Sequence, residues 1–314
     1  MGKASRTKVE VTRREKIAAQ RAAERRAERR RRILIASGSI IAVVAVVLAF
    51  VIFKLNSKPP STATGPNGPT GSALTALVNT TTSVPASTLD AVGTGGGAVT
   101  NLPIKINGTT LTANGKPEML YMGAEYCPYC AAERWAMIVA LSRFGTFSGL
   151  ATTHSASVNG GGQAEPYPDT STWTFAHATY SSPYLTFTPV ELNTNVPDPS
   201  TGGYTTLDKP TAAQEALITK WDNQPYLSSS EPAGSIPFIY FGKAMIVGTS
   251  PAQNEALSGL SWDQIAADLH DPSSAVAKAE DGEANYITAV ICQMTGNQPA
   301  SACTATVQSL ESQV

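Results

Sequence analysis

The sequence predicts an α/β domain that is preceded by one transmembrane helix. Three observations lead to this prediction: a long uncharged apolar run near the N-terminus, an alternation of strand-like and helix-like patterns after it, and a hairpin pattern late in the chain. Hydrophobic residues make up 42% of the 314 positions, which excludes a wholly disordered chain. The length allows one large domain or two small ones.

Basic residues are concentrated at the N-terminus. Residues 1–32 hold 13 of the 23 Lys and Arg residues and only four Glu, whereas the rest of the chain is acidic. Residues 33–53 then run for 21 positions without a charge, and a helix of that length spans roughly 30 Å of hydrocarbon. We therefore predict a basic cytoplasmic arm over residues 1–32 and a transmembrane helix over residues 33–54.

The orientation of this span follows from the charges beside it. A dense basic cluster stays on the cytoplasmic side, which places the C-terminal part of the chain outside the cell membrane. A cleaved signal peptide is the alternative, but its apolar stretch is usually about 7–15 residues, and no small-residue cleavage site separates the run from Lys54. The arm suits an anionic lipid surface. The acidic body argues against nucleic-acid binding, which is left as an alternative for the arm alone.

Residues 55–71 are rich in Pro and Gly and lack apolar periodicity, which is typical of a flexible linker. The extracytoplasmic domain is therefore predicted over residues 72–314. It opens with two short helical patterns, over residues 72–81 and 83–93. Ser83 is suited to cap the second of these helices.

The rest of the domain alternates between the two kinds of pattern. An apolar strand over residues 119–124 ends just before two cysteines, and apolar residues at helical spacing follow them. Residues 235–247 predict a hairpin with Gly242 at its turn. Between these parts, residues 145–235 are irregular and rich in Gly, Pro and Ser. The other predicted elements are strands over 102–106, 173–177 and 184–190 and helices over 211–221, 262–269 and 283–294.

The sequence Cys-Pro-Tyr-Cys at residues 127–130 is the strongest local signal. Thiol–disulfide exchange needs one thiolate that attacks and a second thiol that resolves the mixed disulfide. A helix N-terminus lowers the pKa of the first cysteine, and the second lies one turn further along. We therefore assign Cys127 as the nucleophile and Cys130 as the resolving thiol. A metal site and an inert structural bridge are the alternatives.

Cys292 and Cys303 are the two other cysteines. Their spacing is outside that of ordinary zinc ligands, so we expect neither a metal nor an organic cofactor. In an oxidising compartment the pair predicts a structural disulfide, which is worth about 2–4 kcal/mol. A second redox pair that exchanges electrons with the first is the alternative.

A strand, a Cys-x-x-Cys pair at a helix start, and Ile236-Pro237 before a hairpin resemble the thioredoxin superfamily. The residues from Gly123 to Trp135, followed by Leu-Ser-Arg-Phe-Gly at 141–145, are similar to the bacterial and archaeal membrane-anchored family catalogued as domain of unknown function 929. This resemblance implies a thioredoxin-like fold with a large insertion, residues 145–235, between the catalytic helix and the proline hairpin.

The resemblance also implies roles for single residues. Cys127 and Cys130 would carry the exchange, and Pro237 would face them across a cis peptide bond, which an X-Pro sequence adopts at a modest energetic cost. Ile236 and Pro237 would form the backbone edge along which a substrate peptide lies.

One position departs from the superfamily pattern. Thioredoxin carries a buried acidic residue six positions before its first cysteine, and this chain has Tyr121 there. Glu125 and Glu133 are then the nearest candidates for proton transfer, although each also fits a solvated helix-end charge. Tyr126 and Tyr129 are candidates for contact with the substrate, with packing as the alternative.

These observations predict a membrane-anchored extracytoplasmic thiol–disulfide oxidoreductase that acts on protein thiols and disulfides. Its redox partner would be a membrane quinone-linked oxidant or a thiol carrier, and the direction of electron flow is left open. The alternative is a thioredoxin-fold binding or envelope-assembly module without catalytic activity, for which the insertion would supply the contact surface.

Overall fold

The computed structural model describes residues 64–65, 68–159, 161–227 and 232–314. All of them belong to one unit of the chain, Thr62–Val314. The predicted basic arm and the predicted span at residues 33–54 lie outside the described residues. Within the described ones, no helix has the length and apolar character needed to cross a bilayer.

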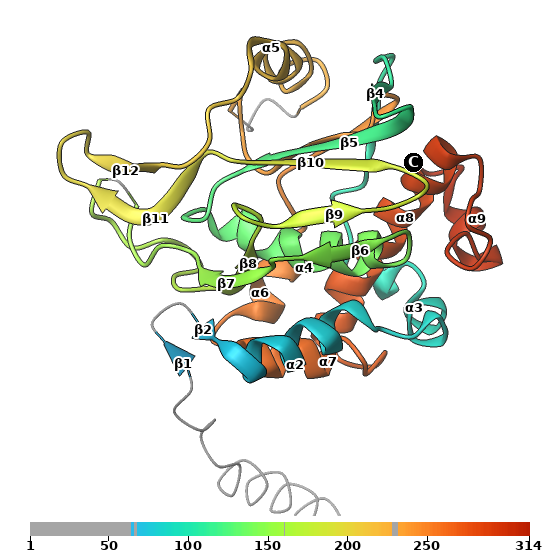
Figure 1. Ribbon diagram of the computed structural model, residues 1–314, viewed down its shortest axis with the longest axis horizontal. Helices are drawn as coiled ribbons and strands as arrows, with labels where there is room; N and C mark the ends of the chain where they lie inside the picture. The colour runs from blue at the N-terminus through green and yellow to red at the C-terminus, as the bar shows by residue number, and fades with distance from the viewer. Residues whose placement is uncertain (1–63, 66–67, 160, 228–231) are drawn as a thin grey trace, which may run out of the picture. The chain divides into compact units, whose positions relative to one another are not determined.

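A mixed sheet of six strands organises this unit (Figure 1). Strand β10 lies parallel to β5, whereas the other neighbours pair antiparallel. The prediction of an α/β fold is therefore confirmed. The strands follow the order β10 (Thr186–Glu191), β5 (Lys116–Gly123), β13 (Phe238–Tyr240), β14 (Ala244–Val247) and β3 (Ile104–Lys105), and β4 (Leu111–Ala113) pairs with β5.

Strand β5 is buried on both faces, which explains its unbroken apolar run. Met119 and Tyr121 belong to the larger hydrophobic core, together with the long helix α4 (Pro128–Ser142). Leu120 and Met122 point the other way, into a smaller core that α5 (Ala212–Trp221) closes. Figure 1 shows α4 and α5 on opposite sides of the sheet.

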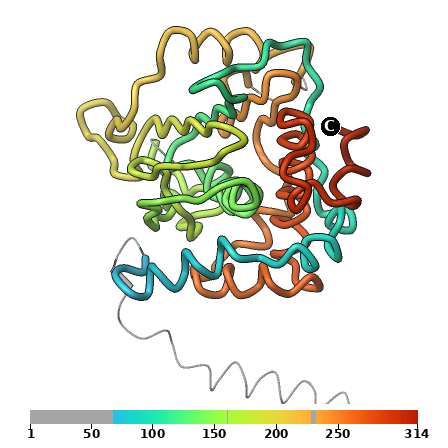
Figure 2. Tube along the Cα trace, turned by 45° about the vertical axis from the view of Figure 1, so that its right-hand side comes forward, coloured from blue at the N-terminus to red at the C-terminus, as the bar shows by residue number. Residues whose placement is uncertain are grey.

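Helix α4 forms the centre of the larger core, and 13 of its 15 residues are buried. It contacts several other helical segments, and α2 runs beside α7 along the edge of this helical layer (Figure 2). The helical segments are α2 (Gly71–Thr82), α3 (Ala86–Val92), the 3-10 turn η1 (Gly95–Gly97), α6 (Pro251–Leu257), α7 (Trp262–Asp268), the π-helical turn η2 (Ala277–Asp281), α8 (Gly282–Thr295) and α9 (Ala305–Leu310).

The predicted insertion is only partly an addition to the central sheet. It forms three small antiparallel sheets, but it also contains β10, the strand that lies next to β5. The pairing joins segments about 70 residues apart, so local sequence patterns could not indicate it. The small sheets pair β6 (Thr146–Ser148) with β9 (Thr179–Ser181), β7 (Ala151–His154) with β8 (Ser171–Thr174), and β11 (Asn193–Asp198) with β12 (Gly203–Thr206).

The folded unit begins before the predicted boundary at residue 72. Strand β2 (Gly68–Pro69) pairs with β1 (Thr64–Gly65), and its two residues are buried. The Thr152 hydroxyl donates a hydrogen bond to the carbonyl oxygen of Pro69. The Pro/Gly composition of the predicted linker is typical of a segment without its own core. It does not indicate that the end of this segment packs against β7.

The prediction that Ser83 caps the second helix was wrong. Ser83 closes α2, because its backbone N–H donates to the Thr80 carbonyl oxygen. Pro85 has the extended conformation of an N-cap, and α3 begins at Ala86. The helix still ends as predicted, with Gly93 at a positive φ of 57°.

Cys292 and Cys303 are joined by the disulfide bond that the sequence indicates, with an S–S distance of 2.01 Å. The bond links α8 to the segment before α9. It leaves no thiolates there for a four-cysteine zinc site. Among the described residues, no group of three or more His, Cys, Asp or Glu side chains is placed to hold a metal ion.

Candidate functional site

Cys127 occupies the N-cap of α4, with φ −76° and ψ 122°. The backbone N–H of Cys130 donates to the Cys127 sulfur at 3.3 Å, so the sulfur takes the place that a capping oxygen has in other helices. Pro128 follows in the first turn of the helix. The N–H groups there have no carbonyl partner within the helix, so the missing N–H of proline loses no hydrogen bond. The sulfur of Cys127 therefore lies at the positive end of the helix dipole, where a thiolate is stabilised.

The loop before β13 meets this helix end. The Ile236–Pro237 peptide bond is cis, and the Cys127 thiol donates to the Ile236 carbonyl oxygen at an S···O distance of 3.7 Å. The fold thereby joins two segments that lie 109 residues apart in the chain. Pro237 therefore lies in the loop that contacts the first cysteine.

The two cysteines have opposite electrostatic environments. Burial raises the pKa of the Cys127 thiol, but hydrogen bonds from Cys130 and the positive charge of Arg134 outweigh burial, and the pKa falls below its usual value. Burial raises the pKa of Cys130, and the hydrogen bond and charge of Cys127 raise it further. The Cys127 thiol is thus the more readily ionised of the two, and the Cys130 thiol the less readily ionised.

Tyr121 lies beneath the cysteines on β5, with a fully buried side chain. A Cβ atom on Gly123 would lie 2.1 Å from the Tyr121 hydroxyl oxygen and 3.1 Å from the Cys130 sulfur. Position 123 therefore has to be glycine, because any side chain would overlap the tyrosine ring. The tyrosine hydroxyl and the sulfur lie against the same point of the backbone.

Arg134 and Glu191 form a buried ion pair behind this tyrosine. Their two hydrogen bonds measure 2.9 and 2.8 Å in the paired, fork-like geometry of an arginine and a carboxylate. The Arg134 guanidinium carbon is 6.0 Å from the centroid of the Tyr121 ring. Burial lowers the pKa of Arg134, but Glu191 outweighs burial and the pKa is raised, so the cation persists. Its charge lowers the pKa of both cysteines.

The two predicted proton-transfer residues have different surroundings. Glu125 is half-buried, and its backbone N–H donates to the Asn193 carbonyl oxygen. Glu133 is fully buried on α4, where its charge interacts with those of Glu280 and Glu283. Burial raises the pKa of Glu133 to about 8, against an opposing effect of a hydrogen bond with Gln253. A role for either glutamate in proton transfer to Cys130 stays a prediction.

Tyrosines from the insertion meet those of the motif. The ring of Tyr126 stacks on that of Tyr204 with a centroid distance of 4.3 Å, and the Tyr204 hydroxyl donates to the Val158 carbonyl oxygen. Tyr129 is 39% exposed and meets Tyr167 edge-on at 6.4 Å. Parts of the insertion therefore form the rim around Cys127.

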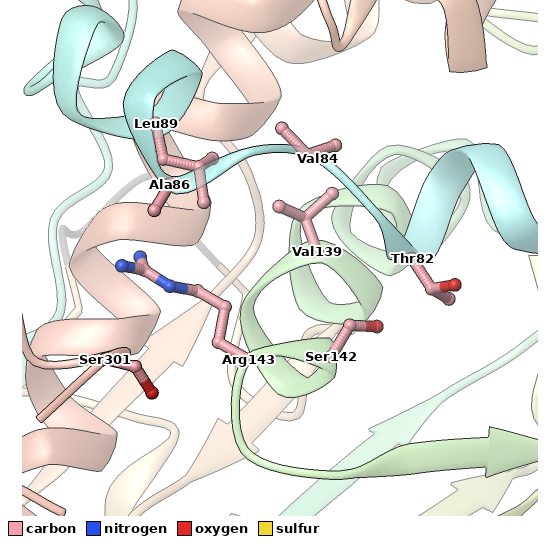
Figure 3. Close-up of a pocket in the computed structure, with 8 residues that line it drawn as sticks. All are labelled: Thr82, Val84, Ala86, Leu89, Val139, Ser142, Arg143 and Ser301. Atoms are coloured by element: carbon pink, nitrogen blue, oxygen red, sulfur yellow. The ribbon is translucent and has the colours of Figure 1, made fainter. Parts of the chain in front are cut away.

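A separate pocket of about 210 Å³ lies at the other end of α4, between this helix, α3 and the loop that joins α2 to α3 (Figure 3). Arg143 is its charged lining residue, but the guanidinium already donates to Asn285, to Thr288 and to the Ala302 carbonyl oxygen. These hydrogen bonds fix the arginine in place. The pocket does not include either cysteine of the motif.

Sequence reasoning assigned no role to Arg134, Glu191 or Tyr204, and it noted Tyr121 only as a departure. One signal was present: Arg134 follows Glu133 in a helical stretch that is otherwise almost entirely apolar, which is typical of buried charges with partners. The partner itself could not be identified, because Glu191 is 57 residues away.

Comparisons with known proteins agree with one of the two resemblances. Neither the curated proteins nor the solved structures contain a match to this chain. The model of the family described as domain of unknown function (DUF929) matches residues 102–293, well over half of the chain. The match includes the cysteine motif, the cis-proline loop and Cys292. The chain therefore belongs to the DUF929 family.

Proposed function

We propose that the chain is a membrane-anchored, extracytoplasmic thiol–disulfide oxidoreductase that acts on protein thiols and disulfides. One observation carries this proposal: Cys127 and Cys130 lie one turn apart at the N-terminus of α4, with a lowered pKa at the first cysteine and a raised pKa at the second. An attacking thiolate and a resolving thiol need this difference. A structural disulfide needs neither a helix dipole nor a nearby cation.

The finer fold belongs to the same proposal. Strand β5, helix α4 and strand β10 form a parallel β–α–β unit, and the β13–β14 hairpin continues the sheet after the cis-proline. Helix α8 then packs against α4. This order supports a thioredoxin-like fold, in which the three small sheets of the insertion are additions around the site.

The chemistry balances without any cofactor. When a substrate disulfide is reduced, the Cys127 thiolate forms a bond to one substrate sulfur, and the other sulfur leaves as a thiolate that takes a proton from water. Cys130 then loses its proton and attacks the Cys127 sulfur, which breaks the mixed disulfide and releases the second substrate thiolate. Two electrons pass from the cysteine pair to the substrate, and the reverse sequence oxidises a dithiol. A membrane quinone-linked oxidant or a thiol carrier would return the pair to its starting state.

Substrate contacts would come from both sides of Cys127. Ile236 and Pro237 offer a backbone edge beside the sulfur, and a proline there leaves no N–H to pair with the chain's own strands. Tyr126 and Tyr129 would contact the residues next to the substrate cysteine. Burial raises the pKa of Tyr126 to about 12, so its hydroxyl stays neutral at physiological pH.

One observation favours the alternative, a binding module for envelope assembly. Val158 and Val196, both in the insertion, are 41% and 56% exposed. Exposed aliphatic side chains on a rim are common at protein contact surfaces. A non-catalytic module would use this rim without exchanging electrons.

Trapping of mixed disulfides tests the proposal. The full-length chain with Cys130→Ser should accumulate dithiothreitol-sensitive adducts to proteins through Cys127 in cells. The matched controls are Cys127→Ser, which lacks the nucleophile, and the double variant. If Cys130→Ser forms no more adducts than these controls, and Cys127 resists alkylation at neutral pH, the binding-module alternative replaces the proposal.

The direction of electron flow has its own measurement. The reduction potential of the Cys127–Cys130 pair can be determined by equilibration with glutathione. A value of about −120 mV would indicate an oxidant of substrate thiols, and one of about −270 mV a reductant of substrate disulfides.

A further inference from the structure

Tyr121 buries a hydroxyl group for which the described part of the chain provides no hydrogen-bond partner. Its ring is well packed, since it meets Phe175 edge-on at a centroid distance of 5.4 Å and lies beside Arg134. Phenylalanine would make the same ring contacts without an unpaired polar atom. Because an unsatisfied buried hydroxyl lowers stability, packing alone does not account for a tyrosine here.

The hydroxyl lies near the resolving cysteine. A Cβ atom at Gly123 would lie 2.1 Å from the Tyr121 oxygen and 3.1 Å from the Cys130 sulfur, so both atoms lie close to the same point of the backbone, with no side chain at position 123 between them. The negative charge of a Cys130 thiolate also opposes ionisation of Tyr121, which places the two groups within electrostatic reach.

Cys130 needs a stabilising neighbour in order to react. Burial, together with the hydrogen bond and charge of Cys127, raises its pKa well above the usual value. The titratable and charged groups around it are Cys127 and Arg134 from the α4 segment, Tyr121 from β5, and Glu191 from β10. Burial raises the pKa of Tyr121 well above its usual value, so the hydroxyl keeps its proton and acts as a donor.

We propose that the Tyr121 hydroxyl donates a hydrogen bond to the Cys130 sulfur when Cys130 becomes a thiolate, and that Tyr121 is thereby a catalytic residue of the resolution step. This inference rests on the proposed oxidoreductase function. In that step the Cys130 proton goes to water, the Cys127–Cys130 bond forms, and the bond from Cys127 to the substrate sulfur breaks. The departing substrate sulfur takes the electron pair and is then protonated by water. Tyr121 neither gains nor loses a proton.

Tyrosine does here what a carboxylate cannot do. A carboxylate that stays ionised repels the thiolate, whereas a neutral hydroxyl that keeps its proton stabilises the thiolate by donation. The Arg134 cation, which Glu191 holds in place, supplies the long-range part of the stabilisation.

The test is the variant Tyr121→Phe in the full-length chain, with 5,5′-dithiobis(2-nitrobenzoate) as the disulfide. Release of the coloured thiol has two phases: the first reports attack by Cys127, and the second reports resolution by Cys130. A hydrogen bond to a charged group corresponds to about a tenfold change in the thiolate fraction. A thiolate of higher pKa is also more nucleophilic, so we expect Tyr121→Phe to slow the second phase about threefold at neutral pH and leave the first nearly unchanged.

A second measurement follows Cys130 directly and needs no exchange reaction. In a Cys127→Ser background, the ¹³Cβ resonance of Cys130 reports its ionisation, and Tyr121→Phe should move the midpoint upward by about one pH unit. The matched control is Tyr240→Phe on the neighbouring strand β13. It removes a buried tyrosine hydroxyl that donates to the Thr109 carbonyl oxygen, in the smaller core on the other face of the sheet.

The outcomes separate this inference from the function on which it rests. A slower second phase and a raised midpoint in Tyr121→Phe, but not in Tyr240→Phe, support the inference. Unchanged values in Tyr121→Phe overturn it and leave the oxidoreductase proposal standing. If the wild-type chain shows no first phase, the proposed function fails. Tyr121→Phe should unfold at the same temperature as the wild type or higher, because it removes an unpaired hydroxyl.

Discussion

Glu133 and Arg134 are neighbours on α4, and both side chains are fully buried, yet their electrostatic surroundings are opposite. Arg134 reaches Glu191 on β10 and forms two hydrogen bonds with its carboxylate. Glu133 instead meets Glu280 and Glu283 from the η2–α8 segment, and the hydrogen bond with Gln253 does not outweigh its burial. The sheet side of the helix is therefore charge-paired at Arg134, whereas Glu133 on the helical side faces two other carboxyl groups.

The difference shows two ways of burying ionisable groups. A paired arginine and carboxylate stay charged, and they create a fixed field beside the cysteines. Carboxyls without a cation instead take up protons, because burial raises the pKa of Glu133 to about 8 and that of Glu280 well above its usual value. Because the Arg134 cation persists, its field beside Cys127 and Cys130 does not change with protonation of the acids on the other side of α4.

Breaking the pair on the sheet side should have the largest effect on stability. Glu191→Gln leaves the Arg134 charge buried without a counter-ion, which costs about 3–5 kcal/mol of unfolding free energy. The control is Arg134→Met combined with Glu191→Leu, which removes both charges and should cost much less. Denaturant unfolding measures both. A loss below about 1 kcal/mol in Glu191→Gln would show that the arginine finds another partner.

Removing the Cys292–Cys303 disulfide should have the next largest effect on the free energy of unfolding. This change tests whether the disulfide and the buried acids on the helical side of α4 affect stability independently of each other. Cys292→Ala with Cys303→Ala opens a loop of sequence separation 11, which is worth about 3 kcal/mol. Because a disulfide does not titrate, the loss should be the same at pH 5 and at pH 8. Denaturant unfolding at both values checks this, and a loss that differs between them would mean that the bond also positions the buried acids.

The smallest effect at any one step of one pH unit is a change in the slope of stability against pH. The pKa of Glu133 is raised from its ordinary value of 4.5 to about 8, so the folded state holds this proton more tightly than the unfolded state. Its contribution is complete below about pH 4.5 and is lost as the pH rises through about 8. Asp281, with a pKa that burial raises to about 8 against an opposing effect of Arg143, acts in the same direction. Melting temperatures should therefore fall between pH 5 and pH 8.

Glu133→Gln keeps the shape of the side chain and removes the titration. It should lower the slope by up to about 1.4 kcal/mol per pH unit in that range. Glu215→Gln, on the exposed face of α5, is the control and should leave the slope as it is. If Glu133→Gln keeps the wild-type slope, as Glu215→Gln should, then Glu133 does not take up a proton on folding and the contrast between the two sides of α4 is wrong.

The cysteine motif was predicted from local patterns because its chemistry is local. A strand of apolar residues, a turn, and a helix with a cysteine at its N-cap are all encoded within residues 116–142, and the structure forms them there. The hairpin at residues 235–247 was predicted for the same reason. The N-cap of α3 was predicted wrongly from the same kind of local pattern, because proline fixes the backbone before α3 more strongly than the Ser83 side chain can.

The partners of the site could not be predicted, because they come from distant segments. Nothing in the local pattern of residues 186–191 indicates that this strand lies parallel to β5, or that its last residue faces Arg134. The acids of η2 and α8 are spaced as they would be on a solvated helix, and only the packing of α4 against them buries their charges. Burial and counter-ions decide the charge state of an ionisable group, and both are properties of the fold.

The sequence by itself determined the α/β class, the position of the cysteine pair at a helix start, the Cys292–Cys303 pairing and the proline before the hairpin, because each depends on residues close together or on residue type. The tertiary structure alone decided which strand completes the sheet beside β5 and which side of α4 carries paired charges. It also placed near Cys130 a tyrosine hydroxyl that has no hydrogen-bond partner among the described residues. These features depend on contacts between segments far apart in the chain, which form only when the two cores close around α4 and β5.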